Sequence, residues 1–398
     1  MSNPSRWDPS RTGPEGHAAL GLFQLAPGHL HLNHGSYGAL PTAVSAEQDR
    51  WRARIESNAT GFFADVLPGE LRRQAAVAAQ CFGGAPQDWV FCENATSAVN
   101  AVLASMGLRD NDEIVTTSHA YGAVLKAMRI WASRFGARVA VADIPAIVRG
   151  EDEIISAIEK VLTARTRLLV VDHITSPTAI VFPVQRIVRI ARERGVAVLV
   201  DGAHAPGQVL LDVETIGADW YTGNAHKWLF APKGCGLLWT APHWQERTRP
   251  TVLSHGAPDG YTQAFDWIGT RDVTPWLCFE TAAGRHAAFG GKGLIARNRA
   301  LAAEGASLVC AVLGAAPSAP ESLRAAMASV ALGPAPADLS EVNSLRRTLW
   351  EGANIVVPVF TFGDRLWIRI SSQIYNELGD YTRLADRMAA PPAPAETR

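Results

Sequence analysis

Short apolar runs alternate with helical patterns along most of the chain. The runs are rich in Val, Ile and Leu and show little polar alternation, which is typical of parallel strands buried on both faces. This pattern predicts seven strands: Trp89–Cys92, Glu113–Thr117, Arg138–Val141, Leu168–Asp172, Val196–Val200, Trp220–Thr222 and Gly236–Trp239. The strand–helix–strand repetition predicts an α/β fold built on a mostly parallel seven-stranded sheet with helices on both faces.

Helical spacing separates these predicted strands. Between Pro183 and Gly195, apolar residues recur at i, i+3, i+4 and i+7, which predicts a helix that begins after the proline and ends before the glycine. One further helix is expected to follow Asn94, and another to run through residues 123–135. Each lies between two strands, as a parallel sheet requires.

The alternation weakens after about residue 280, which indicates a second unit. Residues 315–340 are rich in Ala, Pro and Ser and are expected to be loose. A strand pair, Ile355–Phe362 and Arg365–Ser371, follows and predicts a smaller α+β C-terminal domain. The predicted division is an N-terminal arm (1–30), a large domain (31–280), a small domain (281–388) and a disordered Pro/Ala-rich tail (389–398).

Composition excludes several classes of partner. The 37 basic and 38 acidic residues give a net charge of −1 and form no basic run, so neither nucleic acid nor an anionic membrane is an expected partner. No apolar stretch reaches 18 residues, so no membrane span is expected. Five scattered cysteines without a Cys-x-x-Cys pair, and a polar start without a signal-peptide pattern, favour the reducing cytoplasm.

Short motifs exclude other cofactors. The chain has no His-Glu-x-x-His arrangement and no Walker-type loop, so a metallohydrolase or a nucleotide hydrolase is not expected, and no metal is predicted. A dinucleotide site would need Gly-x-Gly-x-x-Gly after the first strand, whereas Gly234-Cys-Gly236 precedes a strand.

Polar residues follow five of the predicted strands and are expected to converge on one crevice, because ligands bind beyond the carboxyl ends of parallel strands. These segments are Glu93–Val99, Ser118–Gly122, Asp172–Pro177, Asp201–His204 and Gly223–Lys227. Together they supply an anion site, an acid, imidazoles and one lysine.

Each of three features has a functional and a structural interpretation. The helix N-terminus after Asn94 would bind phosphate, or the asparagine would only cap the helix. Asp201 would pair with a protonated pyridine nitrogen, or it would cap a loop. Lys227 would be a desolvated amine suited to a Schiff base, or a solvated surface lysine. Their convergence favours the functional interpretation.

The motifs resemble those of a known family. Asp201–His204, followed by a segment that contains Lys227 and Gly234-Cys-Gly236, resembles the signature of class V aminotransferase-fold enzymes. More narrowly, the chain resembles the isopenicillin N epimerase-like group over roughly residues 30–385. The matching segments are Leu32–Gly38, Asn94–Thr96, Asp172–Thr178, Asn224–Leu229 and Arg369–Asn376. The resemblance implies fold type I of the pyridoxal 5′-phosphate (PLP)-dependent transferases, with PLP as cofactor.

The resemblance also implies residue roles at the ring of the cofactor. Lys227 would form the internal aldimine and carry the proton at Cα, and Asp201 would pair with the pyridine nitrogen. His119 would stack on the ring face. His204, together with Thr175 or Ser176, would lie near the phenolic oxygen.

The resemblance also implies which residues contact the phosphate of the cofactor. They are Asn94, Ala95, Thr96, Asn224 and His226. At the position of Asn224, the wider class usually has a small residue, so this chain differs there. Thr270 would reach the phosphate from a second subunit, which implies a homodimer with the active site at the interface.

The implied substrate is an amino acid. Arg369 would bind its carboxylate through a bidentate pair, or would be a surface ion pair. The segment Asn33, His34, Gly35 and Ser36 would close over the substrate, and Tyr121 would lie at the mouth of the pocket.

The reaction stays open at this stage. Epimerisation, transamination and β-elimination all proceed through an external aldimine and a quinonoid, and all need Lys227 and Asp201. A persulfide-forming desulfurase is disfavoured because Cys278 and Cys310 lie in apolar runs. We expect an epimerase or a C–S β-lyase. An aminotransferase and a catalytically silent binding protein on the same fold remain the alternatives.

Overall fold

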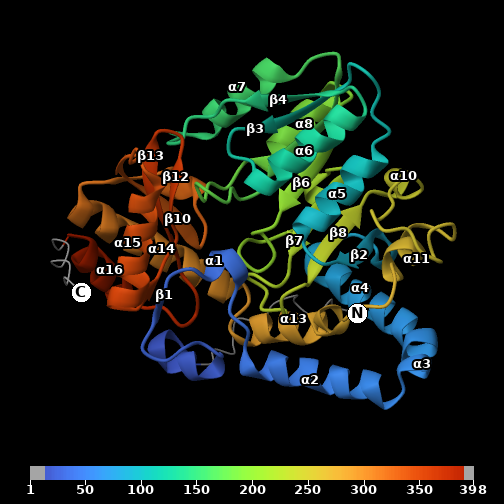
Figure 1. The fold of residues 1–398 in the computed structure, drawn as a ribbon, viewed down its shortest axis with the longest axis horizontal. Coiled ribbons are helices and arrows are strands. Elements are labelled where there is room, and N and C mark those ends of the chain that lie inside the picture. The colour runs from blue at the N-terminus through green and yellow to red at the C-terminus, as the bar shows by residue number, and fades with distance from the viewer. Residues whose placement is uncertain (1–13, 390–398) are drawn as a thin grey trace.

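A seven-stranded sheet forms the centre of the larger unit (Figure 1). Its strands are β2 (Trp89–Cys92), β3 (Glu113–Thr117), β4 (Arg138–Ala142), β5 (Thr166–Asp172), β6 (Ala197–Gly202), β7 (Trp220–Asn224) and β8 (Gly236–Thr240). The computed structural model describes residues 14–389 and gives the strand order β2-β8-β7-β6-β5-β3-β4. β3 to β7 pair in parallel, while β8 runs antiparallel to both of its neighbours. The predicted mostly parallel sheet is confirmed.

Several strands extend further at their carboxyl ends than the apolar runs predict. The pairing of β6 with β7 continues through Asp201↔Thr222 and Gly202↔Gly223. Asp172 pairs in register with Asp201 on the neighbouring strand. The ladder uses backbone groups, so it does not stop where the side chains become polar. The polar ends of β5, β6 and β7 are therefore held side by side in the sheet.

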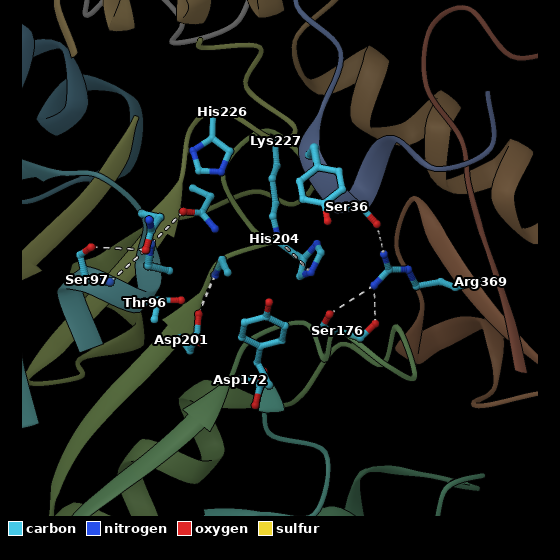
Figure 2. A pocket seen from close by; sticks show the side chains of 16 residues that line it. Ser36, Thr96, Ser97, Asp172, Ser176, Asp201, His204, His226, Lys227 and Arg369 are labelled. Carbon is cyan, nitrogen blue, oxygen red and sulfur yellow. Dashed lines mark hydrogen bonds between the residues drawn. The ribbon is translucent and has the colours of Figure 1, made fainter. Parts of the chain in front are cut away.

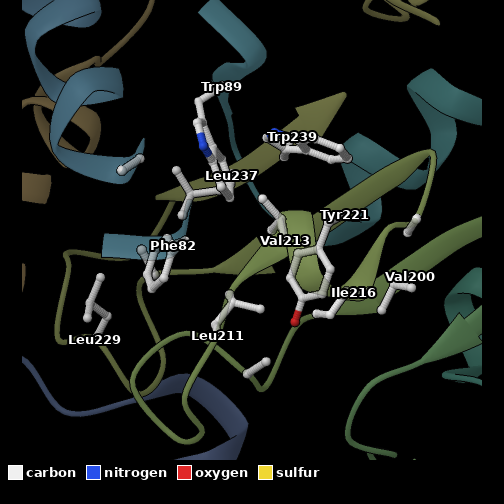
Figure 3. Packing of buried hydrophobic residues seen from close by; sticks show 14 of the residues in the cluster. Phe82, Trp89, Val200, Leu211, Val213, Ile216, Tyr221, Leu229, Leu237 and Trp239 are labelled. Atoms are coloured by element: carbon white, nitrogen blue, oxygen red, sulfur yellow. The ribbon is translucent and has the colours of Figure 1, made fainter. Parts of the chain in front are cut away.

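Neighbouring residues of one strand pack against opposite helical layers. Val171 on β5 belongs to the cluster that packs against α4 (Leu67–Phe82), α7 (Glu151–Val161) and α8 (Val184–Glu193). Val170 packs instead with α5 (Ala95–Ser105) and α6 (Gly122–Arg134). Figure 3 shows part of the first of these layers, to which Phe82, Val213 and the strand residue Tyr221 all belong. Burial on both faces explains why these strands lack polar alternation.

The helices of this unit have the following bounds: α2 (Thr42–Ser57), α3 (Ala59–Gly61), η2 (Phe62–Val66), α4 (Leu67–Phe82), η3 (Pro86–Asp88), α5 (Ala95–Ser105), α6 (Gly122–Arg134), α7 (Glu151–Val161), α8 (Val184–Glu193), α9 (Val213–Ile216), α10 (Pro242–Gln245), α11 (Tyr261–Asp266), α12 (Thr274–Leu277) and α13 (Phe279–Ala288). α5, α6 and α8 correspond to the three helices that the sequence pattern predicts. Among residues 14–389, no helix combines the length and apolarity needed to cross a membrane.

The smaller unit is built on an antiparallel sheet with the strand order β12-β13-β10-β9. Its elements are α14 (Lys292–Leu313), β9 (Ala316–Pro317), η4 (Glu321–Leu323), β10 (Met327–Pro334), α15 (Leu339–Ala353), β11 (Ile355–Val356), β12 (Val359–Phe362), β13 (Arg365–Ser371) and α16 (Leu378–Ala389). This confirms the α+β unit at the C-terminal end. The predicted boundary at residue 280 falls inside α13 and stays a prediction, and the predicted tail lies almost entirely outside the described residues.

Residues 315–340 are more ordered than the sequence predicts. They contain β10, which pairs with β13 on one side and with β9 on the other. The Ala, Ser and Gly residues of β10 have little intrinsic preference for strands, so β10 could not be predicted from the composition of this segment. The predicted strand Ile355–Phe362 is in turn divided into β11 and β12.

The N-terminal segment packs against both units (Figure 1). It contains η1 (Gly16–Leu22), β1 (Leu30–His31) and α1 (His34–Tyr37), and β1 pairs in parallel with β11 of the smaller unit. Directly after α1, Gly38 has a φ of 70° and packs against the turn that carries Lys227. A Cβ at Gly38 would lie 2.3 Å from the carbonyl oxygen of His226. Only glycine therefore fits at this contact.

We predict that Gly38→Ala lowers the free energy of unfolding by about 3 kcal/mol, because it adds left-handed backbone strain to a steric clash. Gly28 is the matched control. Its φ is 77°, but a Cβ there would meet no atom within 4 Å, so Gly28→Ala should cost about 1 kcal/mol. Denaturant unfolding of both variants measures the difference, and equal losses would contradict the contact.

Candidate active site

A cavity of about 650 Å³ lies at the carboxyl ends of β5, β6 and β7 (Figure 2). It is lined by Ser36, Tyr37, Asn94, Ala95, Thr96, Ser97, Tyr121, Asp172, Ser176, Asp201, Ala203, His204, Asn224, His226, Lys227 and Arg369. The larger unit, the N-terminal segment and the smaller unit all contribute to this lining. The predicted crevice is therefore present, with the single lysine inside it.

Lys227 lies in the turn that follows β7, and its Nζ is 3.3 Å from Nε2 of His204. Burial and, after it, the positive charge of Arg369 lower the pKa of Lys227 to about 7, against the opposite effect of Asp201 and Asp172. At neutral pH a large share of this amine is therefore uncharged. An uncharged amine is the form that can attack a carbonyl carbon.

Two carboxyl groups, Asp172 and Asp201, end neighbouring strands and line the cavity together. Burial raises the pKa of both, and the charge of Asp201 raises the pKa of Asp172 further. Oδ1 of Asp201 accepts a hydrogen bond of 3.0 Å from the N–H of Ala203. Asp172 belongs to a segment expected at the crevice but received no role from the sequence, although it ends an apolar strand as Asp201 does.

The N-terminus of α5 forms one wall of the cavity. Asn94 caps this helix, and its Oδ1 accepts a 3.0 Å hydrogen bond from the N–H of Ser97. The N–H of Ala95 donates to Oδ1 of Asn224 at 2.8 Å, which ties the helix to the end of β7. Thr96, Ser97 and His226 complete this wall (Figure 2). Because a helix N-terminus favours anions, this is the end of the cavity suited to a phosphate.

Arg369 reaches the cavity from β13 of the smaller unit. Its Nη2 donates to Oγ of Ser36 at 3.0 Å, and its Nη1 donates to the carbonyl oxygen of Ser176 (Figure 2). Burial lowers the pKa of Arg369 to about 10, so the guanidinium stays charged at neutral pH. The interpretation as a surface ion pair is wrong, since Arg369 is only 5% exposed and points into the cavity.

His119 is not where the ring-stacking prediction places it. It is fully buried outside the cavity lining, where its Nδ1 lies 2.6 Å from Oγ1 of Thr178 and its Nε2 faces the carbonyl oxygens of Ile144 and Pro145. Both ring nitrogens are thus engaged by the protein. Tyr121, two residues further along the turn, lines the cavity instead.

Other predicted residues lie next to the cavity without lining it. The hydroxyl of Thr175 is buried against Thr178, so of the two predicted alternatives only Ser176 faces the cavity. His34 is buried with its Nε2 3.1 Å from the carbonyl oxygen of Lys227 and therefore supports the lysine turn. Thr270 is exposed and lies outside the lining of this chain's cavity.

In the N-terminal segment, Ser36 lines the cavity, whereas Asn33 and Gly35 lie behind it. Oδ1 of Asn33 accepts from Oγ of Ser36, and the N–H of Gly35 donates to Oγ of Ser371 at 3.2 Å. Tyr37 also faces the cavity and was not predicted as a site residue. Its exposed fraction of 72% places it at the mouth.

Cys278 and Cys310 lie outside the lining of the cavity. Cys278 is fully buried, and burial raises the pKa of its thiol to about 12, while Cys310 packs against the core of the smaller unit. The described residues contain no group of three or more histidine, cysteine or acidic side chains that could hold a metal ion.

The donor set fits PLP. The cavity combines an amine with a pKa near 7, a buried carboxyl pair and a capped helix N-terminus. In addition, Nδ1 of His204 is buried and has no hydrogen-bond partner among the described residues, so it can serve a bound group.

Comparisons with known proteins agree with this fit. A family model described as "Aminotransferase class-V" matches residues 70–264. Isopenicillin N epimerase of Streptomyces clavuligerus is 31% identical over 94% of this chain and 97% of that protein. A putative L-cysteine desulfhydrase of Oryza sativa subsp. japonica is 32% identical over 90% of this chain and 82% of that protein.

The fold is shared with solved structures as well. A variant of the C–S lyase C-DES, with glycine covalently linked to its PLP cofactor, matches with a TM-score of 0.77 at 20% identity and covers 91% of this chain and 97% of that one. With a family model, full-length relatives and a cavity that suits the cofactor, the chain belongs to the class V aminotransferase family and is a PLP-dependent enzyme.

Proposed function

We propose that this enzyme is a C–S lyase that removes a sulfur substituent from Cβ of a cysteine-type amino acid. The observation that carries this proposal is that Lys227, with a pKa of about 7, lines the cavity as an amine that can accept a proton at neutral pH. Burial lowers the pKa of His226 to about 4 and that of His204 well below its usual value. Elimination needs one base, and the cavity offers one.

The substrate would be held by its carboxylate. Arg369 is already oriented by Ser36 and Ser176, so its guanidinium can receive a carboxylate without further ordering. Lys227 lies within the same cavity, so the Cα–H of a substrate bound at Arg369 would be presented to its amine. Buried Arg369 also lowers the pKa of Lys227, which couples substrate binding to the basicity of the amine.

We propose the following roles for the residues that hold the cofactor. When bound, PLP draws electrons from a bond at Cα of the substrate. Asp201 would hold the proton on the pyridine nitrogen, and His204 would donate to or accept from a ring substituent through its free Nδ1. The α5 N-terminus with Asn94 would bind the phosphate.

Epimerisation is the second candidate, and the tyrosines at the mouth support it. Tyr37 and Tyr121 both line the cavity, and both lie close enough to Arg369 to act on its pKa. A phenol could serve as an acid on the substrate face opposite Lys227. However, Tyr37 is 72% exposed and Tyr121 is 47% exposed, so solvent competes for these hydroxyls, and we place epimerisation second.

We further propose a homodimer in the cytoplasm. Thr270 is exposed and is not part of its own chain's cavity lining, as expected of a residue that serves the partner subunit's site. Cys92, Cys235, Cys278 and Cys310 are free thiols, which suits a reducing compartment.

Covalent attachment at Lys227 is the first prediction from this site. The purified protein should absorb in the near-violet, and borohydride reduction followed by peptide mapping should place the label on Lys227. Lys227→Ala should lose both signals. Lys233→Ala is the matched control, because Lys233 lies in the same loop but outside the cavity lining. A retained label in Lys227→Ala would contradict the assignment.

The rate of PLP capture by apoprotein should depend on pH through the same amine. Lys227 is protonated and unreactive below its pKa of about 7, so the rate should rise through pH 7 and level off above it. In Arg369→Gln the neighbouring positive charge is gone, so the pKa of Lys227 should rise and the midpoint should move to higher pH. Stopped-flow absorbance measures both curves. A wild-type rate that keeps rising towards pH 10 would show an unperturbed lysine.

Product analysis tests the reaction itself. With S-substituted cysteines in deuterium oxide, a lyase releases pyruvate, ammonia and a thiol at equal rates. Recovery of substrate that is deuterated and inverted at Cα, without pyruvate, would replace this proposal by epimerisation. Turnover that depends on an added keto acid would replace it by transamination.

A further inference from the structure

A second cavity, of about 510 Å³, opens between the segment that follows β6 and the start of α14. Gln208 and Leu210 line it from the first segment, Ile295 and Arg299 from α14, and Arg324 from the chain after η4. Among the described residues, it shares no lining residue with the active-site cavity. It is a separate site.

Arg324 is the unusual member of this lining. Arg324 is only 8% exposed. Its Nε and Nη1 have no hydrogen-bond partner among the residues that the structure describes. Buried guanidinium nitrogens without an acceptor, here Nε and Nη1, are costly, and an acceptor supplied by a ligand would offset that cost. Glu321 also lines the cavity and its charge acts on Arg324, but its carboxylate accepts no hydrogen bond from Nε or Nη1 of that arginine.

The remaining lining combines positive charge with apolar surface. The lining carries three positively charged side chains, Lys292, Arg299 and Arg324. The negative charge of Glu321 balances one of these three charges. Val209, Leu210 and Ile295 supply apolar walls, and Leu210 is 63% exposed. Exposed apolar surface beside excess positive charge suits a ligand that carries both an anionic group and an apolar body.

We propose that this cavity binds an organic carboxylate with an apolar body, with the carboxylate on Arg324 and the apolar body against Leu210 and Ile295. A planar carboxylate matches the fork of a guanidinium. The volume is in the range of small-molecule sites, so a ligand of roughly ten heavy atoms is accommodated. The site does not depend on the reaction that the enzyme catalyses.

Octanoate is the probe, titrated calorimetrically into holoenzyme that carries Arg369→Gln, so that the active-site guanidinium cannot bind it. One octanoate should bind per chain. Acetate lacks the apolar body and 1-octanol lacks the carboxylate, so both should bind at least tenfold more weakly. Arg324→Met should weaken octanoate at least tenfold. Arg347→Gln, an exposed arginine elsewhere, should change nothing. Unchanged octanoate affinity in Arg324→Met, or acetate binding as tightly as octanoate, would overturn the proposal.

Thermal unfolding provides an independent measurement. Octanoate should raise the Tm of the Arg369→Gln holoenzyme but not that of the enzyme that also carries Arg324→Met. Without octanoate, Arg324→Met should leave the Tm unchanged or raise it, because a buried unpaired charge is removed. A Tm that falls by several degrees would show that the guanidinium has a partner within the protein, and the proposal would fail. If that variant does not fold, Leu210→Glu should weaken octanoate at least tenfold through charge repulsion, and unchanged affinity would again overturn the site.

Discussion

The burial of four charged side chains in one cavity is the constraint on which the rest of the structure depends. Lys227, Arg369, Asp172 and Asp201 line the same cavity, and burial shifts the pKa of each toward its neutral form. Such groups are costly to desolvate unless their positions are fixed closely. The sheet fixes them, because Asp172 and Asp201 are register partners on adjacent strands and the lysine follows the next strand in the sheet.

The central sheet could be predicted because its strands are buried on both faces, and that burial leaves continuous apolar runs in the sequence. β10 could not be predicted, because a strand such as Met327–Pro334 is stabilised by its neighbours β9 and β13 rather than by its own small side chains. The contact of Gly38 with the turn that carries Lys227 could not be predicted either. It joins residues that are nearly 190 positions apart, and no local pattern reports such a contact.

The candidate site shows the same division between local and tertiary information. Lys227, Asp201 and Asn94 could be identified because each lies directly after a strand, and the fold brings strand ends together. Within a turn, however, the direction of a side chain depends on tertiary contacts. His119 turns inward to Thr178, whereas Tyr121 faces the cavity, and Thr175 is buried whereas Ser176 is not. A sequence motif locates such a turn but does not tell which of its residues reach the ligand.

Arg369 explains how one arrangement can serve relatives with different activities. Its guanidinium lies on the smaller unit, while Ser36 belongs to the N-terminal segment and Ser176 to the larger unit, so all three parts of the chain meet at one group. This contact would hold the carboxylate end of an amino acid at a constant position relative to Lys227. The opposite end would face Tyr37 and Tyr121 at the open mouth, where side chains are exposed and can change without disturbing the buried charges. The choice between elimination and epimerisation would then rest on the mouth of the cavity, since the buried groups suit both reactions.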